Sequence, residues 1–495
     1  MSGDTGMQTI GQMPTPTDES GRLPAVLTGL VWTLWVVCIG IAGVQLWQDT
    51  SWTLTELVAV DGLTTVMWVT VTFFSGIIHS YSQRYMAGSE TINRFFVRVF
   101  AFTLVVMMLV ATNNFVLFGA VWLVMGLIMA ELIGHADGWK QAQAAASVAR
   151  KAFLASTTFL GVALLTLWLE TGATTVSGIS PAISNASTPT VLIATGGLLL
   201  AAMIQSALVP FHTWLLSSMT APTPASALMH AGFVNAGGVL LVRFAPVVTV
   251  EPAFMLVVVL VGAASALFGK LLKAVQTDVK GELGCSTVGQ MGFMIMQAGL
   301  GFFAAALTHL ILHGFYKAYQ FLSTGGQVAH ESPGQSTESV SMGLVDAVVI
   351  GVTGLAGGGL FALLTGKGTK FDTGILLTLL VVLTVLHAAR DIAGHASLPT
   401  PVRYGAVPLI ALPAIVLYAA AYGAVTELIA GLPAVGSPAE LTVIHGLVTV
   451  TFVLAYVVIE TGVYKRSHRL YVTLINASEP PTEALLTSTE EYNEY

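Results

Sequence analysis

Residues 207–238, ALVPFHTWLLSSMTAPTPASALMHAGFVNAGG, decide the fold, because they interrupt a very apolar chain with prolines, histidines and small polar residues. Proline has no backbone N–H and breaks or kinks a helix. Inside a membrane, non-helical backbone is tolerated only where it is buried in protein or lines a water-filled cavity. We therefore interpret Pro210 as the break in a membrane helix whose freed backbone groups face water or ions.

The composition of the whole chain agrees with this interpretation. Of its 495 residues, 55% are hydrophobic and 9% are charged, which is more apolar surface than one water-soluble core can bury. Apolar runs of about 20 residues, long enough to cross about 30 Å of hydrocarbon, recur along nearly the whole chain. There are about fourteen such segments, at 24–46, 61–79, 95–111, 113–134, 148–172, 190–218, 225–245, 252–275, 283–302, 304–326, 341–366, 373–391, 405–428 and 441–463. The predicted fold class is an all-α integral membrane protein with about 14 transmembrane helices.

Two polar ends flank these segments. Residues 1–23 lack the basic region of a signal peptide, and residues 464–495 are acidic and rich in Pro, Ser and Thr, so we expect both to be flexible cytoplasmic tails. With fourteen crossings, most Lys and Arg residues fall on the side of the termini, which the positive-inside rule makes cytoplasmic. We expect a multi-pass protein of the bacterial inner membrane, with the lipid bilayer as a partner and no nucleic-acid partner.

Metal-binding spacing is missing from the sequence. Cys38 and Cys285 are far apart, and the histidines have no cysteine or carboxylate partners at zinc-type spacing. We expect no metal, no cofactor and no catalytic residue in this chain.

Ionisable residues inside the apolar segments are costly in hydrocarbon and mark ion or proton paths by default. In HLILHGFYKAYQF, His309, His313 and Lys317 recur at i, i+4 and i+8 and so share one helix face. Two imidazoles and an amine in one stripe can pass protons along. The alternative is a packing face satisfied by neighbouring hydroxyl and carbonyl groups, and we favour conduction.

Other ionisable residues leave two interpretations open. His230 lies in an otherwise apolar helix, where a lone histidine is more often structural than functional. Glu131, near the end of its segment, is either a carboxylate that admits cations or an interfacial residue. Glu460, His387 and Arg390 also lie near helix ends, where interfacial anchoring is the favoured role.

A second interrupted segment is expected at 341–366, where Gly358 and Gly359 lie within a glycine-rich run that ends near Lys367. Two broken segments at corresponding places are typical of inverted repeats. The predicted organisation is a pair of five-helix repeats at 95–245 and 252–391, preceded by N-terminal helices at 24–94 and followed by C-terminal helices at 405–463.

Five stretches carry a family resemblance in their order and spacing. They are VDGLTTVMWVTVTFFSGIIHSYSQRYM, NNFVLFGAVWLVMGL, the stretch at 207–238, QTDVKGELGCSTVGQMGFM and HLILHGFYKAYQFLSTGG. Together they resemble the proton-conducting antiporter-like subunits of respiratory complex I and of Mrp-type cation/proton antiporters, over about residues 58–390.

The resemblance implies a path of buried charges along the middle of the membrane. In the family, a Glu–Lys pair in the first repeat leads to a histidine or lysine, then to the second repeat, and out through a lysine on the second broken helix. The matching residues here are His230, His313 with Lys317, and Lys367.

The first half of the chain departs from the family pattern. Leu123 follows Trp122 where the family has glutamate, and Gln205 stands where the family has lysine. Glu131, eight residues after Leu123, either replaces the missing glutamate or belongs to a closed half-channel.

The missing pair favours a third branch, the DabB-like (MpsA-like) membrane subunits of inorganic-carbon uptake complexes. This resemblance implies that H+, or alternatively Na+, moves through the chain and energises one-way hydration of CO2 to bicarbonate. The hydration would occur in a large cytoplasmic zinc-binding DabA-like partner with a carbonic-anhydrase-like site. The zinc would belong to that partner, and the heteromer could contain more than two subunits.

Two alternatives remain beside this branch. The first is an Mrp-type antiporter or a complex I-type pump subunit. A larger complex I subunit would carry a long lateral helix after the bundle, which we do not expect in residues 464–495. The second alternative is a scaffold that does not conduct and only anchors a partner.

Overall fold

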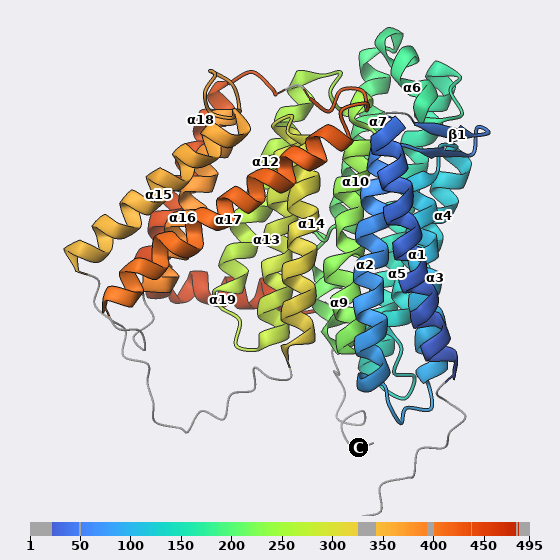
Figure 1. The fold of residues 1–495 in the computed structure, drawn as a ribbon, viewed down its shortest axis with the longest axis horizontal. Coiled ribbons are helices and arrows are strands. Elements are labelled where there is room, and N and C mark those ends of the chain that lie inside the picture. Colours follow the sequence, from blue (N-terminus) through green and yellow to red (C-terminus); the bar gives the residue numbers. More distant parts are fainter. Residues whose placement is uncertain are drawn as a thin grey trace, which may run out of the picture.

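The computed structural model describes residues 22–48, 51–324, 343–393, 400–436, 438–481 and 484. Helices account for most of this part of the chain (Figure 1), which confirms the predicted all-α class. A short antiparallel hairpin, β1 (Trp52–Leu54) with β2 (Val58–Val60), was not predicted. The predicted flexibility of residues 1–21 and of those beyond 484 lies outside the described residues.

The first half of the chain forms a bundle of long helices with short helical turns between them. Its elements are α1 (Arg22–Gln48), α2 (Gly62–Tyr85), α3 (Ile92–Ala111), α4 (Phe115–Ile133), α5 (Lys140–Thr171), α6 (Val176–Ala182), η1 (Ile183–Asn185), α7 (Thr188–Gln205), α8 (Thr213–Ser217), η2 (Ser218–Thr220), α9 (Thr223–Ala231), η3 (Phe233–Asn235), α10 (Ala236–Arg243) and α11 (Ala245–Val248). Side-chain caps fix two helix starts. Asp61 accepts from the backbone N–H of Thr64, and Asn114 accepts from two N–H groups of α4.

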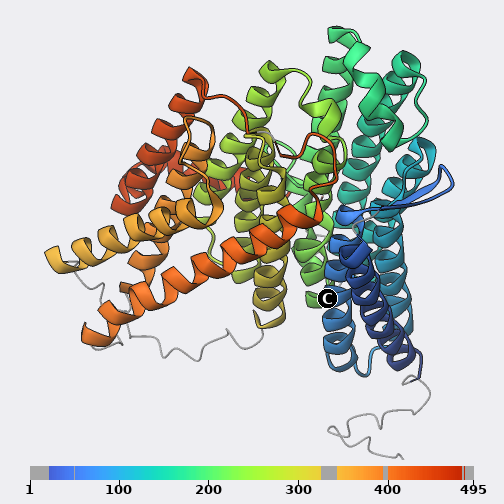
Figure 2. The ribbon, with the colours of Figure 1, turned by 45° about the horizontal axis from the view of Figure 1, so that its top comes forward.

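The second half continues beside the first and then turns away from it. Its elements are α12 (Pro252–Lys273), α13 (Val279–Gly299), α14 (Phe303–Leu322), α15 (Leu344–Thr365), α16 (Gly374–Ala393), α17 (Thr400–Leu428), α18 (Val443–Thr461), η5 (Val463–Arg466) and α19 (His468–Ser478). Figures 1 and 2 show α12, α13 and α14 standing next to the first bundle, with α17 tilted across them and α15 tilted on the side away from the first bundle.

Membrane-spanning helices make up most of the described chain. Eleven helices in the described ranges are long and apolar enough to cross a membrane, and α16 is a shorter apolar helix. The predicted segments at 283–302 and 304–326 correspond to α13 and α14, which carry more polar side chains and are not among these eleven. The chain is therefore a multi-pass membrane protein, but the count of fourteen is not confirmed.

The interruption in the first half lies where the proline indicated. Helix α7 ends at Gln205, and α8 begins at Thr213, with Pro210 in the non-helical backbone between them. A further interruption follows directly after His230, because α9 ends at Ala231 and a turn of 3-10 helix precedes α10. This interruption differs from the prediction of one continuous segment at 225–245.

The predicted break at Gly358 and Gly359 is wrong, because α15 is continuous through both residues. Gly357 and Gly358 instead allow close helix packing. A Cβ atom on Gly358 would lie 2.2 Å from Cγ2 of Val382 on α16, and one on Gly357 would lie 2.7 Å from Ile415 of α17. Small residues commonly let membrane helices approach each other in this way, so glycine here serves packing and not interruption.

Helix α19 was also missed, since residues 464–495 were predicted to be a tail. Its start is capped by Ser467, whose side chain accepts from the backbone N–H of Leu470. Leu474 is buried in a small cluster with Leu216 and Leu272, and the ring of His212 bonds the carbonyl of Ala477 at 2.9 Å. These contacts with distant segments hold the helix against the end of the bundle.

Candidate functional site

Helix α14 presents the predicted stripe of His309, His313 and Lys317 to the interior of the bundle. The helix packs against α2, α9, α13 and α17. Gly314 lets it approach closely, because a Cβ there would lie 2.9 Å from the carbonyl oxygen of Ala231 on α9. Lys317 is 0% exposed and His313 is 6% exposed, so the stripe places a titratable amine and two imidazoles away from lipid.

A backbone carbonyl holds the buried amine of Lys317. Its Nζ donates to the carbonyl oxygen of Leu283, in the first turns of α13, at 2.9 Å. A buried ammonium without an anionic partner is costly. One hydrogen bond to a carbonyl offsets only part of this cost, as is typical of ionisable residues kept in membranes for function.

Thr287 on α13 links His230 to the same carbonyl. Its hydroxyl donates to the oxygen of Leu283 at 2.9 Å and lies 2.9 Å from Nδ1 of His230. A hydroxyl has one proton to donate. With that proton directed to Leu283, Nδ1 of His230 is the donor. His230, Thr287, Leu283 and Lys317 therefore form one hydrogen-bonded network across α9, α13 and α14, which we call the relay network.

Several ring nitrogens beside the relay network are buried and have no hydrogen-bond partner among the described residues. They are Nε2 of His230, Nε2 of His309 and both nitrogens of His313. The rings of His309 and His313 are nearly parallel with centroids 6.0 Å apart, and Phe321 stacks on His230 at 4.4 Å. An unsatisfied buried polar group costs about 1–3 kcal/mol, so these nitrogens are well placed to accept a proton or a water molecule.

A cavity of about 620 Å³ reaches His309. Helices α12, α13, α14, α16, α17 and α18 surround it, and its lining includes Gln297, whose Oε1 is buried without a partner in the described chain. A cavity of this size that has polar groups such as Gln297 in its lining can hold water molecules. The stripe on α14 therefore connects a water-accessible space with the relay network.

The first half of the chain has neutral groups at the positions where the resemblance implies a charge pair. Gln205 is 0% exposed, and neither its Oε1 nor its Nε2 has a partner among the described residues. Next to Leu123, the indole of Trp122 donates to Ser156 at 3.1 Å, and Ser156 donates to the carbonyl of Ala201 at 3.0 Å. This region of α4, α5 and α7 is held by neutral hydrogen bonds.

Glu131 lies between two arginines. Its carboxylate pairs with Arg98 at 2.7 Å and with Arg150 at 2.8 Å, and its side chain is 48% exposed. The arginines come from α3 and α5, so the carboxylate joins three neighbouring helix ends. This geometry agrees with the interfacial alternative for Glu131.

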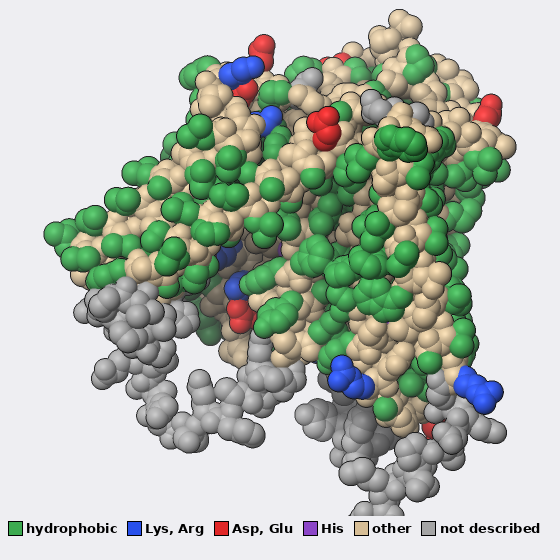
Figure 3. All heavy atoms as spheres, in the orientation of Figure 1, with side chains coloured by type: hydrophobic (Ala, Val, Ile, Leu, Met, Phe, Trp, Pro, Cys, Tyr) green, Lys and Arg blue, Asp and Glu red, His purple; other side chains and the backbone are tan. Residues whose placement is uncertain are grey.

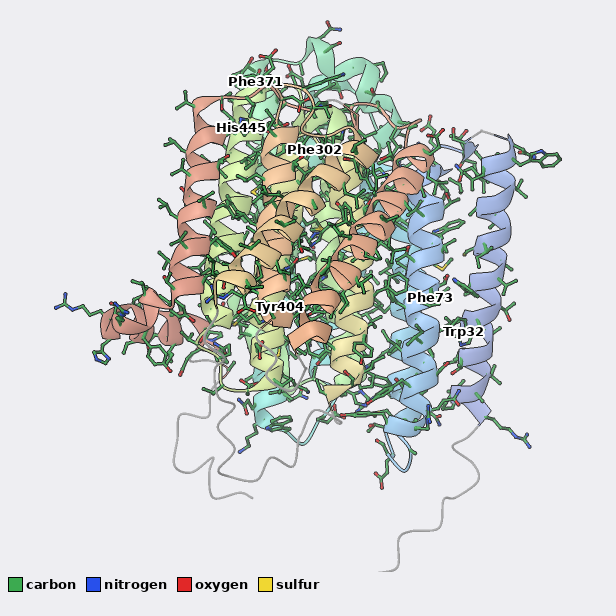
Figure 4. The ribbon with its side chains drawn as sticks, turned by 60° about the vertical axis from the view of Figure 1, so that its left-hand side comes forward. Trp32, Phe73, Phe302, Phe371, Tyr404 and His445 are labelled. Carbon is green, nitrogen blue, oxygen red and sulfur yellow. The ribbon has the colours of Figure 1, made fainter. Side chains whose placement is uncertain are left out.

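Lys367 does not lie on a broken helix but in the loop after α15. Its Nζ is 4.8 Å from the ring centroid of Phe302, the residue that precedes α14. Figure 4 shows Phe302 at the same end of the bundle as Phe371 and His445. His309 is seven residues further along α14, about 10 Å at 1.5 Å per residue. Lys367 and Lys317 are therefore near opposite ends of the same helix.

Sequence reasoning missed the residues that connect the helices. Thr287 and the carbonyl of Leu283 belong to the relay network, and Lys270 contacts His387 beside the cavity. The spacing of Leu283 and Thr287 by four residues is a weak signal for a hydroxyl bonded within its own helix. Lys270 near the end of an apolar segment gave no signal that separates it from an interfacial lysine.

Thiols and metal ligands contribute nothing further to this site. Cys38 and Cys285 are both buried as free thiols. In the part of the chain that the structure describes, no group of three or more His, Cys, Asp or Glu residues could hold a metal ion. Zinc in a partner protein stays a prediction.

Comparison with known families and proteins identifies what the chain is similar to. The family model described as NADH:quinone oxidoreductase/Mrp antiporter, TM, matches residues 112–351, and that described as NADH-ubiquinone oxidoreductase (complex I), chain 5 N-terminus, matches residues 50–96.

Individual relatives come from several branches. The chain is 37% identical over 286 residues to the probable inorganic carbon transporter subunit DabB1 of Halothiobacillus neapolitanus, covering 55% of this chain and 50% of that protein. It is 37% identical over 276 residues to NADH-quinone oxidoreductase subunit L of Mycobacterium tuberculosis, covering 54% and 43%. The chain thus spans about half the length of the curated relatives it matches.

A solved structure shares the fold. The Mrp complex from Dietzia sp. DQ12-45-1b superimposes with a TM-score of 0.55 at 21% identity, covering 93% of this chain and 49% of the Mrp chain. At this level of identity the likeness concerns the fold alone.

Proposed function

Because the chain belongs to the antiporter-like membrane-subunit family of complex I and Mrp antiporters, we propose that it conducts H+, or alternatively Na+, to energise one-way CO2 hydration by a partner protein. The observation that carries this proposal is the complete burial of Lys317 inside the relay network. The cation path would use His230, His313 with Lys317, and His309, and leave past Lys367.

The geometry of the stripe supports protons as the main candidate ion. Imidazoles titrate near physiological pH and have two nitrogens that can receive and release a proton. His230 is tied to the Lys317 acceptor through a hydroxyl, and His313 has two unpartnered nitrogens in the same region. A sodium site needs several oxygen ligands, and the stripe supplies nitrogen atoms.

Two observations favour the inorganic-carbon branch. Relatives from Halothiobacillus neapolitanus, Hydrogenovibrio crunogenus and Bacillus subtilis are named as probable inorganic carbon transporter subunits. Leu123 and Gln205 are neutral residues where the resemblance implies a charge pair, and the amide of Gln205 has no partner among the described residues. We infer that the first half-channel does not conduct, and that Pro210 interrupts a helix with a structural role.

The proposed partner is a large cytoplasmic zinc-binding DabA-like protein with a carbonic-anhydrase-like site, and the bicarbonate would accumulate on that side. We infer that the chain lies in the inner membrane of a bacterial cell and that both of its termini are in the cytoplasm. In such an assembly zinc would belong to the partner, and further subunits could join.

The second candidate function is an Mrp-type antiporter or a complex I-type pump subunit. It is favoured by the similarity to subunit L, which is as high in identity as the similarity to DabB1. Co-purification separates the two candidates. A single large zinc protein supports the carbon branch, whereas several similar membrane subunits support the antiporter branch and contradict the first.

Growth and flux measurements test the conduction itself. Cells that lack carbonic anhydrase and express the chain with the proteins encoded beside it should grow in air. Lys317→Met should abolish this growth and lower proton uptake by vesicles about 100-fold, the lower end of what a positioned acid or base contributes to proton transfer. The ammonium of Lys317 is costly to bury with only a carbonyl as partner, so an apolar residue of similar size should not weaken the fold and assembly should survive.

A matched control is available in the loop after α15. Lys370 is exposed, and Lys370→Met should leave growth and proton uptake unchanged. If Lys317→Met assembles and supports parental growth, the stripe does not conduct and the chain acts as a scaffold.

A further inference from the structure

The cavity that reaches His309 has a polar mouth and extends deep into the bundle. On α16 its lining runs from Leu377 to Ala388, a length of about 16 Å at 1.5 Å per residue. That is about half of a hydrocarbon core of about 30 Å. Figure 3 shows acidic and basic side chains in a hollow of the surface below α17. The cavity thus has the dimensions of a half-channel.

A chain of hydrogen bonds crosses the mouth of this cavity. Nζ of Lys270 lies 2.7 Å from Nε2 of His387, and Nδ1 of His387 lies 2.6 Å from Oε1 of Glu460. Arg390 pairs with the other oxygen of Glu460 at 3.0 Å. These residues come from the C-terminal ends of α12, α16 and α18, so the contacts bring three distant segments together.

Burial differs along this chain of groups. The Glu460 side chain is 10% exposed, whereas the His387 side chain is 35% exposed. Lys273, Tyr316, Tyr418 and Tyr456 also face the cavity, and Lys273 pairs with Glu282 at 3.1 Å. The carboxylate is therefore more protected from water than the imidazole that contacts it.

We infer that Glu460, His387 and Lys270 pass protons between the mouth of the cavity and His309. This inference rests on the proposed function and deepens it by naming the residues of the second half that exchange protons at the mouth. It supplies an access route that does not depend on the first half, where Leu123 and Gln205 are neutral.

The transfer balances in atoms and charge. A proton on Glu460 passes to Nδ1 of His387 while the proton on Nε2 of His387 passes to the neutral amine of Lys270. The O–H and Nε2–H bonds break, the Nδ1–H and Nζ–H bonds form, and the carboxylate and ammonium result. The ammonium then releases its proton to water in the cavity, which His309 also lines. Arg390 keeps the carboxylate in place without taking part in the transfer.

Glutamine at position 387 separates a relay from a structural clamp. The amide of His387→Gln can accept from Lys270 and donate to Glu460, but it cannot pass a proton between them. In inverted vesicles containing the full chain and the proteins encoded beside it, we expect proton uptake about 100-fold below the parent. Thr451→Val, a control on the exposed face of the same helix whose hydroxyl bonds the carbonyl of Leu447, should conduct like the parent.

A rescue measurement protects the test against a folding defect. His387→Ala leaves space beside the cavity, so added imidazole should restore proton uptake to this variant, whereas Lys317→Met should not respond to imidazole. Parental uptake by His387→Gln in vesicles where Lys317→Met is inactive would overturn the inference and leave the proposed function standing. Parental uptake by both variants would overturn the proposed function as well.

Discussion

Replacing Thr287 with valine tests the relay network directly, because valine has a shape close to that of threonine and lacks the hydroxyl. The change leaves Nδ1 of His230 buried without the partner that it has at 2.9 Å. Lys317 still donates to Leu283, so the amine keeps its own hydrogen bond. The substitution thus disconnects His230 while it leaves the rest of the network in place.

The expected magnitude follows from the cost of the unpartnered nitrogen. A buried group that loses its partner costs about 1–3 kcal/mol. Since 1.36 kcal/mol corresponds to a factor of ten in rate, proton transfer through His230 should slow by about 5- to 150-fold. We expect this decrease because proton transfer requires the imidazole of His230 to stay aligned.

The assay is proton uptake by inverted vesicles after an acid pulse, followed with a pH-sensitive dye and normalised to the amount of chain. Thr287→Ser is the matched control, because it keeps the hydroxyl and removes only a methyl group. Uptake by Thr287→Ser should resemble that of the parent. Parental uptake by Thr287→Val, in a preparation where Lys317→Met is inactive, would refute the role of the hydroxyl bridge.

Three further predictions concern packing, the first half-channel and pH. The Cβ of Gly358→Ala would lie 2.2 Å from Cγ2 of Val382, so this variant should lose about 1–3 kcal/mol of folding stability through overpacking. The control Gly359→Ala, with nothing within 4 Å of its Cβ, should unfold in detergent at the parental temperature or above. Equal losses of stability in the two variants would contradict the packing role. Gln205→Leu should leave proton uptake unchanged, and a large decrease would show that the first half conducts. Burial and two neighbouring arginines lower the pKa of His135, in the loop after α4, from 6.5 to about 4. Between pH 6.5 and about 4 the unfolded chain therefore binds a proton that the folded protein does not, so the stability of the folded protein falls as the pH drops through this range. In thermal unfolding, His135→Asn should show a weaker dependence of stability on pH.

The membrane class and the stripe on α14 were predictable because they depend on local properties. Length and apolarity decide whether a segment can cross hydrocarbon. The period of the α-helix places residues at i, i+4 and i+8 on one face in any packing, which is why His309, His313 and Lys317 share the interior face. Pro210 was equally informative, since proline cannot complete a helical backbone hydrogen bond.

Glycine residues, in contrast, do not by themselves predict where a helix is interrupted. Gly358 and Gly359 are compatible with a broken helix and with a closely packed one, and a single sequence does not distinguish the two. The neighbouring helix decides between them, because Val382 occupies the space that a side chain on Gly358 would need. The same ambiguity applies to Gly232, because the sequence predicts one continuous segment at 225–245 whereas α9 ends at Ala231.

From the sequence alone one can derive that the chain is helical, that it crosses the membrane many times and that α14 carries a titratable stripe. These properties depend on the composition of short segments and on the helical period, which neighbouring residues reveal. The tertiary structure was needed to show that Thr287 joins His230 to the carbonyl that accepts from Lys317. It was also needed to show that His387 and Glu460, which the sequence suggested were interfacial anchors, contact each other and Lys270 at the mouth of a cavity. These contacts join residues 57 to 117 positions apart. No local pattern encodes them, because they depend on which helix faces pack together.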